Sequence, residues 1–306
     1  MTTELVVISG KGGTGKTSVA ASLAVLAGPI VVADCDVDAA DLHMLLRPEI
    51  RVVHDFYSGR EAILNQSLCV RCGLCADLCE FDAFTRLQDE TGITRMDVRL
   101  LACEGCGVCV RHCAAGAIEF PEKFRGHWFE SDTRCGPMVH ARLLVGSGNS
   151  GKLVNQVRRR AFELARQHDL AWVITDGSPG IGCPVIASLT GATHVLAVTE
   201  PSVSGSHDLL RLLALTRHFS IPTFVCVNKF DIYEPAAREI EHMTKAAGAN
   251  FVGNIPWDRA FAVAQQEGRT VVETDGPGAR MIREIWDRIR EQIGQATQEG
   301  NHDEPA

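Results

Sequence analysis

The chain has 306 residues, a net charge of −8, and a composition that is 45% hydrophobic but only 6% aromatic. An acidic balance argues against a nucleic-acid-binding protein, which needs a basic surface. No run of about 18 apolar residues is present, so no membrane span is expected. The length allows one large domain, or one domain with a small module.

A glycine-rich loop lies near the N-terminus, between an apolar β-branched run and an apolar helical stretch. The run at 4–9 is expected to form a strand, GKGGTGKT at 10–17 forms the loop, and a helix should cover 17–27. Strand, loop and helix in this order make the GxxxxGK(S/T) pattern a phosphate site, because backbone N–H groups converge at a helix N-terminus. We expect Lys16 to reach the β- and γ-phosphates and the Thr17 hydroxyl to bind Mg²⁺. The expected nucleotide-binding residues of the loop are Gly10, Lys11, Gly12, Gly13, Thr14, Gly15, Lys16, Thr17 and Ser18.

The next expected strand, 30–34, ends in a run of acidic residues. Asp34, Asp36 and Asp38 follow one another at alternate positions. Parallel α/β sheets bind ligands at the carboxyl ends of their strands. This places Asp34, together with Asp176 at the end of a later strand, beside the nucleotide.

Two cysteine runs with identical spacing follow. Eight of the 12 cysteines form the pattern CxxCxxCxxxC twice, 34 residues apart, and this is the spacing with which bacterial ferredoxins hold 4Fe-4S clusters. Phe84 and Ile118 each lie five residues after a fourth cysteine, as matched apolar residues over the two clusters. The proline that usually follows the fourth cysteine is replaced by Glu80 and Ala114.

The resemblance to two-cluster ferredoxins implies how the ligands divide, because there the fourth cysteine of each run binds the other cluster. One cluster would be held by Cys69, Cys72, Cys75 and Cys113, and the other by Cys103, Cys106, Cys109 and Cys79. A disulfide framework is typical of short secreted chains, and zinc knuckles use CxxC pairs separated by a longer loop, so both alternatives are disfavoured. Thiolates held for a metal need a reducing compartment, so a cytoplasmic protein is expected.

Beyond the cysteines, apolar strands again alternate with helical patterns. Strands are expected at 171–176, 194–199 and 223–228, and helices at 151–168, 205–218, 234–247 and 278–294. The alternation predicts an α/β fold with a doubly wound, mostly parallel sheet, and the cysteine segment is an inserted α+β module of the ferredoxin kind. The expected domains are a P-loop domain at 1–59 and 124–295, the insert at 60–123, and a polar, disordered tail at 296–306.

Two of the expected helices have informative surfaces. Arg158, Arg159 and Arg160 are expected on the solvated face of helix 151–168. Helix 278–294 mixes both charges on its polar face, so we expect it to dock on the core and not on a membrane. Its apolar residues at helical spacing are Met281, Ile282, Ile285, Trp286, Ile289 and Ile293.

Four motifs together resemble the MinD, ParA and Mrp superfamily of P-loop ATPases, which includes the nitrogenase iron protein. They are the loop GKGGTGKT with its second lysine, the acidic run DCDVD at 34–38, TDGSPG at 175–180 and NKFD at 228–231. The resemblance covers residues 1–58 and 124–295. Within the superfamily, the chain most resembles the members that carry an inserted ferredoxin domain. It implies that Lys11 reaches the nucleotide of the other subunit in an ATP-dependent homodimer.

The same resemblance implies roles for other residues. Asp36 would orient or deprotonate the attacking water, with Asp38 as second choice. Asp176 would hold Mg²⁺ through water. Gly180 would sense the γ-phosphate by its backbone N–H, and Asn228 would contact the adenine base.

Two functions fit these features. The favoured one is an ATP-gated redox protein, in which ATP binding and hydrolysis move the ferredoxin module and its clusters pass electrons to a redox partner protein. The alternative is an ATP-dependent carrier or assembly factor for iron–sulfur or other metal cofactors. Mrp-type carriers share a labile cluster through an exposed CxxC pair, and no CxxC lies outside the two cysteine runs. A positioning role of the MinD or ParA kind is disfavoured by the insert and by the acidic charge.

Overall fold

The computed structural model describes residues 2–88, 94–144 and 150–300, except the side chains of 296–300, and these residues form two compact units. Unit 1 comprises residues 2–54, 127–143 and 150–300, and unit 2 comprises residues 55–88, 94–126 and 144. Strands β3 (Glu49–Arg60) and β8 (Glu122–Thr133) each contain a boundary between the units. The two units are therefore connected along the chain by strands.

Unit 1 is built on a large, mostly parallel sheet. The strand order is β13-β12-β11-β1-β10-β2-β9-β8-β3, and every neighbouring pair from β13 to β9 is parallel. These strands are β1 (Thr3–Ser9), β2 (Val31–Asp34), β9 (Gly136–Leu143), β10 (Trp172–Pro179), β11 (His194–Thr199), β12 (Thr223–Asn228) and β13 (Asn250–Ile255). The five predicted strands are confirmed. On one side of β1 the chain runs outward to β2 and β9 and returns to β10, and it then continues on the other side through β11, β12 and β13. The P-loop strand thus lies at the reversal of strand order, where open α/β sheets bind ligands.

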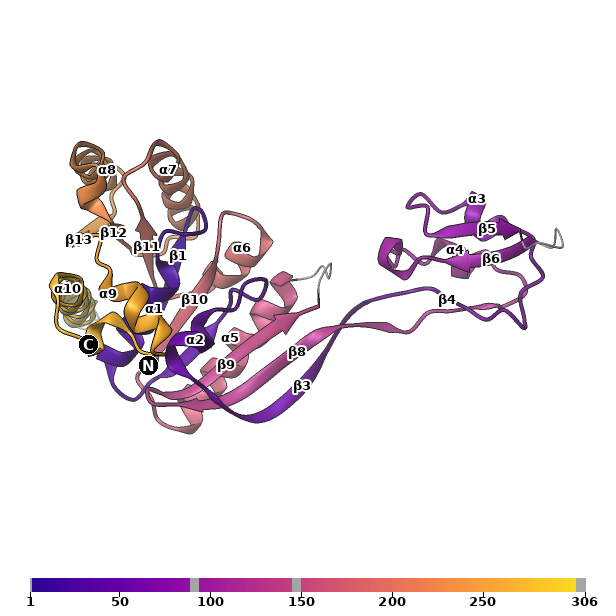
Figure 1. The fold of residues 1–306 in the computed structure, drawn as a ribbon, viewed down its shortest axis with the longest axis horizontal. Coiled ribbons are helices and arrows are strands. Elements are labelled where there is room, and N and C mark those ends of the chain that lie inside the picture. The colour runs from indigo at the N-terminus through magenta and orange to yellow at the C-terminus, as the bar shows by residue number, and fades with distance from the viewer. Residues whose placement is uncertain (1, 89–93, 145–149, 301–306) are drawn as a thin grey trace, which may run out of the picture. The chain divides into compact units, whose positions relative to one another are not determined.

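Helices cover both faces of this sheet (Figure 1). They are α1 (Lys16–Ala27), α2 (Leu42–Leu46), α5 (Ser150–Gln167), α6 (Cys183–Leu189), α7 (Val203–His218), α8 (Glu234–Ala246), α9 (Ala260–Gln266) and α10 (Pro277–Gly300), with short 3₁₀ turns η2 (Phe230–Ile232) and η3 (Val271–Glu273). The five predicted helices are confirmed. None of the helices in the described part of the chain combines the length and apolarity that a bilayer crossing requires.

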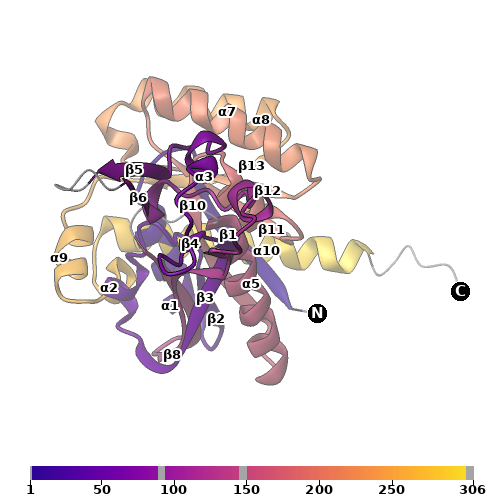
Figure 2. The ribbon, with the colours of Figure 1, turned by 90° about the vertical axis from the view of Figure 1, so that its right-hand side faces the viewer.

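Successive residues of β1 point into two separate cores. In the first core, Leu5 and Val7 pack with α1 and α10. In the second core, on the other face of the sheet, Val6 and Ile8 pack with α6, α7 and α8. Side chains alternate between the faces of a strand, and a strand buried on both faces is apolar throughout. Figure 2 shows α7 and α8 side by side over the second core.

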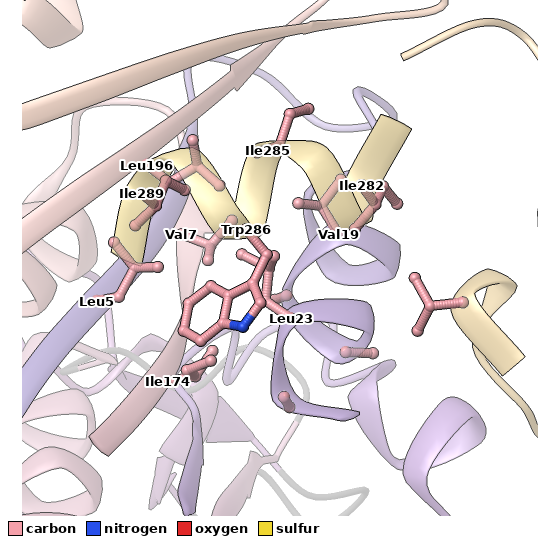
Figure 3. Packing of buried hydrophobic residues seen from close by; sticks show 14 of the residues in the cluster. Leu5, Val7, Val19, Leu23, Ile174, Leu196, Ile282, Ile285, Trp286 and Ile289 are labelled. Carbon is pink, nitrogen blue, oxygen red and sulfur yellow. The ribbon is translucent and has the colours of Figure 1, made fainter. Parts of the chain in front are cut away.

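Helix α10 docks on the first core, as predicted. Ile282, Ile285 and Ile289 are fully buried, and Trp286 is 3% exposed. The indole lies between α1 and the sheet, near Ile174 (Figure 3). The helix continues to Gly300, so the tail expected from 296 begins as helix, and its last residues, 301–306, lie outside the described part of the chain.

The prediction of three solvated arginines on α5 is wrong for Arg158. Its side chain is buried, its Nε lies 2.9 Å from Glu4 Oε1, and it donates to the carbonyl oxygens of Ala187 and Thr190. Glu4 lies in the buried strand β1, where an unpaired carboxylate would be costly. The sequence does not indicate that Arg158 and Glu4 are buried, because the two residues that pair are 154 positions apart.

Unit 2 contains one structural pattern twice. Its elements are β4 (Ile63–Leu64), α3 (Leu74–Asp77), β5 (Phe84–Gln88), β6 (Thr94–Val98), η1 (Leu100–Ala102), α4 (Val108–Arg111) and β7 (Ile118–Glu119). Two antiparallel pairs form, β4 with β7 and β5 with β6, and Figure 1 shows β5 beside β6. Asn65 N–H donates to Ala117 O and Arg99 N–H to Ala83 O. These two bonds join equivalent positions of the repeats, so the backbone around the two cysteine runs is hydrogen-bonded in the same way.

Trp286→Ala should lower the free energy of unfolding by about 3–5 kcal/mol, because it removes a buried aromatic side chain and leaves a cavity in the first core. Equilibrium urea unfolding, followed by circular dichroism, measures the loss. Trp257, 59% exposed, supplies the matched control, and Trp257→Ala should change the value by less than about 0.5 kcal/mol. Equal losses for the two variants would contradict the described packing of α10.

Candidate nucleotide site and cysteine cavity

The P-loop connects β1 to α1 at the carboxyl edge of the sheet. Gly15 stands directly before α1 with φ 88°, a left-handed conformation that suits glycine. A Cβ at this position would lie 2.3 Å from the side-chain nitrogen of Asn228. A cavity of ≈ 320 Å³ lies against the loop, and residues 12–18, Asp36 and Pro179 contribute to its wall.

Lys16 is buried among carboxylates at the base of this cavity. Its Nζ lies 2.6 Å from Asp176 Oδ1 and 3.3 Å from Asp36 Oδ2. Burial opposes the charge on Lys16, but Asp176, Asp36 and then Asp34 outweigh it and raise the pKa of Lys16 above its usual value. Lys16 is therefore a charged ammonium that faces three acidic side chains.

Three carboxyl groups, those of Asp34, Asp36 and Asp176, surround the single ammonium of Lys16. Burial, and then the Asp176 carboxylate, raise the pKa of Asp34 well above its usual value, and burial raises the pKa of Asp36 in spite of Lys16. Asp34 Oδ2, Asp176 Oδ2 and Thr14 Oγ1 are buried and have no hydrogen-bond partner among the described residues. Such atoms commonly mark the place of an ion, a ligand or a water. Carboxylate oxygens beside a phosphate loop fit Mg²⁺, which binds few carboxylates together with substrate phosphates and water.

The two residues considered for the attacking water, Asp36 and Asp38, occupy different environments. Asp36 is 7% exposed, lines the P-loop cavity and contacts Lys16. Asp38 is exposed and is not part of the cavity wall. Thr17, the expected Mg²⁺ ligand, lines the cavity with its Oγ1 3.4 Å from Lys16 Nζ. The geometry favours Asp36.

Lys11 contacts residues that follow β11 in its own chain. Its Nζ lies 2.6 Å from Glu200 Oε1, 2.8 Å from Ser204 Oγ and 3.1 Å from Ser202 Oγ. The other oxygen of Glu200 lies 3.5 Å from Lys229 Nζ. The TEPS segment at 199–202 resembles the same superfamily, but the sequence alone assigned no role to Glu200. The available signal was an acidic residue directly after a parallel strand, but the adjacency of β11 and β1 is visible only in the sheet.

Two residues expected at the nucleotide make hydrogen bonds within the chain. Asn228 is buried, and its Nδ2 donates to Thr14 O at 2.8 Å. The N–H of Gly180 donates to Ser9 O, also at 2.8 Å. Asn228 therefore supports the P-loop backbone in this state. A contact to a γ-phosphate requires the single backbone N–H of Gly180 to exchange its present partner, whereas the NH₂ group of Asn228 has a second N–H donor.

A cavity of ≈ 160 Å³ in unit 2 has cysteines in its wall. Cys69, Cys72 and Cys75 of the first run and Cys113 of the second line it, with Cys109 also present. The first four are the set that the ferredoxin resemblance assigns to one cluster. Among the described residues, no group of three or more His, Cys, Asp or Glu side chains is arranged for a single metal ion. A 4Fe-4S cluster needs a different arrangement from a single ion, because each thiolate binds a different iron and the four sulfurs surround the space that the cluster fills.

Backbone N–H groups point at cysteine sulfurs in both runs. Ala83 N–H donates to Cys79 Sγ and Ala117 N–H to Cys113 Sγ, each at 3.3 Å. These pairs occupy equivalent positions of the repeat. A third bond, 3.5 Å long, joins the amide nitrogen of Ala62 to Cys103 Sγ. Hydrogen bonds of this kind stabilise thiolate charge and help to set the reduction potential of a cluster.

Phe84 and Ile118 form a small buried core with Ala62, and cysteines of both runs pack against it. Burial raises the pKa of the Cys75 thiol and raises that of Cys109 to about 11. These two cysteines are at equivalent positions of the repeat. Both thiols would need the positive charge of a bound metal to ionise at neutral pH. The donor set, the cavity and the N–H groups thus fit an iron–sulfur cluster.

Comparisons with known proteins agree with the fold and the P-loop site. Residues 5–271 match the family model described as CobQ/CobB/MinD/ParA nucleotide binding domain. The uncharacterized protein MJ0578 of Methanocaldococcus jannaschii is 33% identical over 229 residues, which cover 74% of this chain and 78% of that protein. A 74-residue segment is 45% identical to the septum site-determining protein MinD of Buchnera aphidicola, over 22% of this chain and 27% of that one.

Solved structures show the same fold. MinD of Pyrococcus horikoshii, complexed with Mg-ADP, superposes with a TM-score of 0.56 at 15% identity, over 96% of this chain and 98% of its own. The cell division ATPase MinD of Pyrococcus furiosus gives 0.55 at 16% identity, over 95% and 100%. Because the family model matches most of the chain, including the P-loop and strand β10 with Asp176, the chain belongs to the family of CobQ/CobB/MinD/ParA nucleotide-binding domains.

Proposed function

We propose that the chain is an ATP-binding and ATP-hydrolysing iron–sulfur protein, in which the nucleotide state controls electron transfer through two 4Fe-4S clusters. The observation that carries the proposal is the cavity lined by Cys69, Cys72, Cys75 and Cys113. Three cysteines of the first run line this cavity together with Cys113, the fourth cysteine of the second run, and in two-cluster ferredoxins the fourth cysteine of each run binds the other cluster. In the proposed function, the P-loop domain binds the nucleotide and the cysteine module holds the redox clusters, so both sites lie in one chain.

The eight cysteines on the repeated spacing would hold the clusters, which supply one-electron redox chemistry when bound. Cys103, Cys106, Cys109 and Cys79 form the second set. The N–H groups of Ala62, Ala83 and Ala117 would stabilise the ligating sulfurs. Thiolate ligands call for a reducing compartment, so we propose a cytoplasmic location.

On the nucleotide side, few groups are needed, because phosphoryl transfer depends mainly on positioning and charge neutralisation. Lys16 would exchange its contact with Asp176 for the β- and γ-phosphates. Asp176 and Thr17 would then hold Mg²⁺, Asp176 through water. Asp36 lines the cavity and would orient the attacking water. The buried oxygens without partners support this assignment.

The chain itself offers a route between the two sites. Asp36 follows β2, α2 comes next, and β3 leads directly toward the first cysteine run. A change at Asp36 on ATP binding can therefore reach the module through α2 and β3. β8 brings the chain back, so two strands transmit any movement. The partner would be a protein with its own redox centre.

The alternative, a carrier that gives clusters away, predicts exposed and loosely held ligands. Here five of the eight cysteines pack on the Phe84 and Ile118 core, and three sulfurs accept backbone hydrogen bonds. Such ligands favour retention. The redox function is therefore the one that we propose.

Anaerobically purified protein should contain about eight iron and eight acid-labile sulfide per chain, because two cubanes hold four of each. Cys79→Ser and Cys106→Ser should damage the same cluster and give matching electron paramagnetic resonance spectra, distinct from that of Cys72→Ser. Cys183, an exposed cysteine outside the runs, is the control, and Cys183→Ser should keep all eight iron. Stoichiometric zinc without visible absorbance would refute the cluster assignment.

Asp36→Asn should lower the rate of ATP hydrolysis by about 100-fold or more, as expected for loss of a general base, while ATP binding persists. Asp38→Asn, at the exposed position nearby, should leave the rate within about twofold. Steady-state phosphate release measures both. A large loss in Asp38→Asn with little change in Asp36→Asn would reverse the two roles.

Lys11→Ala should prevent dimerisation with a non-hydrolysable ATP analogue while ADP binding by the monomer is kept, because Lys11 acts on the partner's nucleotide in the proposed dimer. Glu200→Gln removes the carboxylate charge that holds Lys11 in its own chain, and it should favour the dimer. Sedimentation velocity with and without the analogue reports both effects. An association state that never changes with nucleotide would contradict the dimer.

A further inference from the structure

We propose that unit 1 has a second ligand site, a cationic cavity beside α2 that binds a small organic anion with a carboxylate or phosphate group and an apolar body. The cavity has a volume of ≈ 420 Å³. Its wall contains Arg47, Arg142, His43 and His140, together with Phe129 and Ile50, and no acidic residue. It is separate from the P-loop cavity, with which it shares no lining residue.

The charges at this cavity are not neutralised by the chain. Within the described residues, the side chains of Arg142 and His43 have no hydrogen bond or ion pair, and the Arg47 guanidinium donates only to the Glu267 carbonyl oxygen. Other arginines of this part of unit 1 are paired: Arg51 contacts Asp132 and Glu49, Arg134 contacts Glu273, and Arg160 contacts Glu130. In a chain of net charge −8, two guanidinium groups without carboxylates around one hollow are a local excess of positive charge. Such a hollow attracts anions.

The remaining wall is apolar and partly aromatic. The rings of Phe129 and His140 stack with centroids 4.9 Å apart and an interplanar angle of 24°. Burial lowers the pKa of His140 to about 4, and its Nε2 lies 2.9 Å from Ser131 Oγ, so this ring is a neutral part of the wall. Ile50 is 52% exposed. Ligand sites combine such apolar walls with a few polar groups, and arginine pairs carboxylates and phosphates with two parallel hydrogen bonds.

The position of α2 links this cavity to the nucleotide site. Ala40 and His43 line the cationic cavity, whereas Ala39, Asp41 and Leu45 line the P-loop cavity. The segment from 39 to 45 therefore has one cavity on each side. At the end of β9, Leu143 N–H donates to Val37 O, next to Asp36. An anion bound between α2 and β9 would bias the position of Asp36, and nucleotide would bias anion affinity by the same factor.

Two probes test the site by isothermal titration calorimetry: phenyl phosphate and phenylacetate. The protein is first saturated with Mg-ADP, so that the P-loop does not compete for phosphate. At least one probe should bind, and Arg142→Ala and Arg47→Ala should each weaken binding about tenfold or more, the scale of a lost charge-assisted hydrogen bond. Arg51→Ala, which removes a paired arginine outside the cavity, should leave the affinity within about twofold.

Comparison of the two probes identifies whether phosphate or carboxylate is preferred. Inorganic phosphate should bind at least about tenfold more weakly than phenyl phosphate, because it makes no contact with the apolar wall. Lack of binding by both aromatic probes, equal binding by Arg142→Ala, or an equal loss in Arg51→Ala would overturn the proposal. The measurement does not require ATP hydrolysis or iron–sulfur clusters, so the second site is tested independently of the proposed function.

Discussion

The Lys16 ammonium joins three parts of the nucleotide site that are distant in sequence. It starts at the P-loop after β1, contacts Asp176 on β10, and contacts Asp36 just beyond β2. A charged amine this deeply buried is tolerated only because carboxylates surround it. Three carboxyl groups thus face a single ammonium, and burial raises the pKa of two of them, Asp34 and Asp36. The site is therefore poised for a cation and a phosphate, and their arrival must rearrange the contacts of Lys16.

In the proposed function, that rearrangement would couple the nucleotide to the rest of the chain. Asp36 is followed in the chain by α2 and then by β3, so in the proposed function a movement of Asp36 would be passed along this segment. Lys11, Gly180 and Asn228 are also bonded to their own chain in this state. In the proposed function, nucleotide binding would change several of these contacts together. The two nucleotide states would then differ in their sets of partners, and each ligand would favour the state that it binds better.

Much of this organisation could be predicted from the sequence, because local patterns carry it. The P-loop, the alternating strands and helices, and the doubled cysteine spacing are each contained in short segments. Contacts between distant segments could not be predicted. Arg158 of α5 is buried because Glu4 of β1 faces it from the sheet, and Lys11 meets Glu200 only because β11 lies next to β1. The strands β9 and β13 and the cationic cavity beside α2 likewise depend on tertiary packing.

The central claim is that nucleotide and cluster redox state are coupled, and a potentiometric titration tests it most directly. Midpoint potentials of the clusters are determined by electron paramagnetic resonance without nucleotide, with Mg-ADP and with a non-hydrolysable ATP analogue. A tenfold coupling corresponds to about 60 mV for a one-electron step, so we expect a shift of about that size with the ATP analogue and none in a Lys16→Ala variant. Identical midpoints in all three states, together with rapid transfer of intact clusters to an acceptor apo-protein, would contradict the account and support a carrier function.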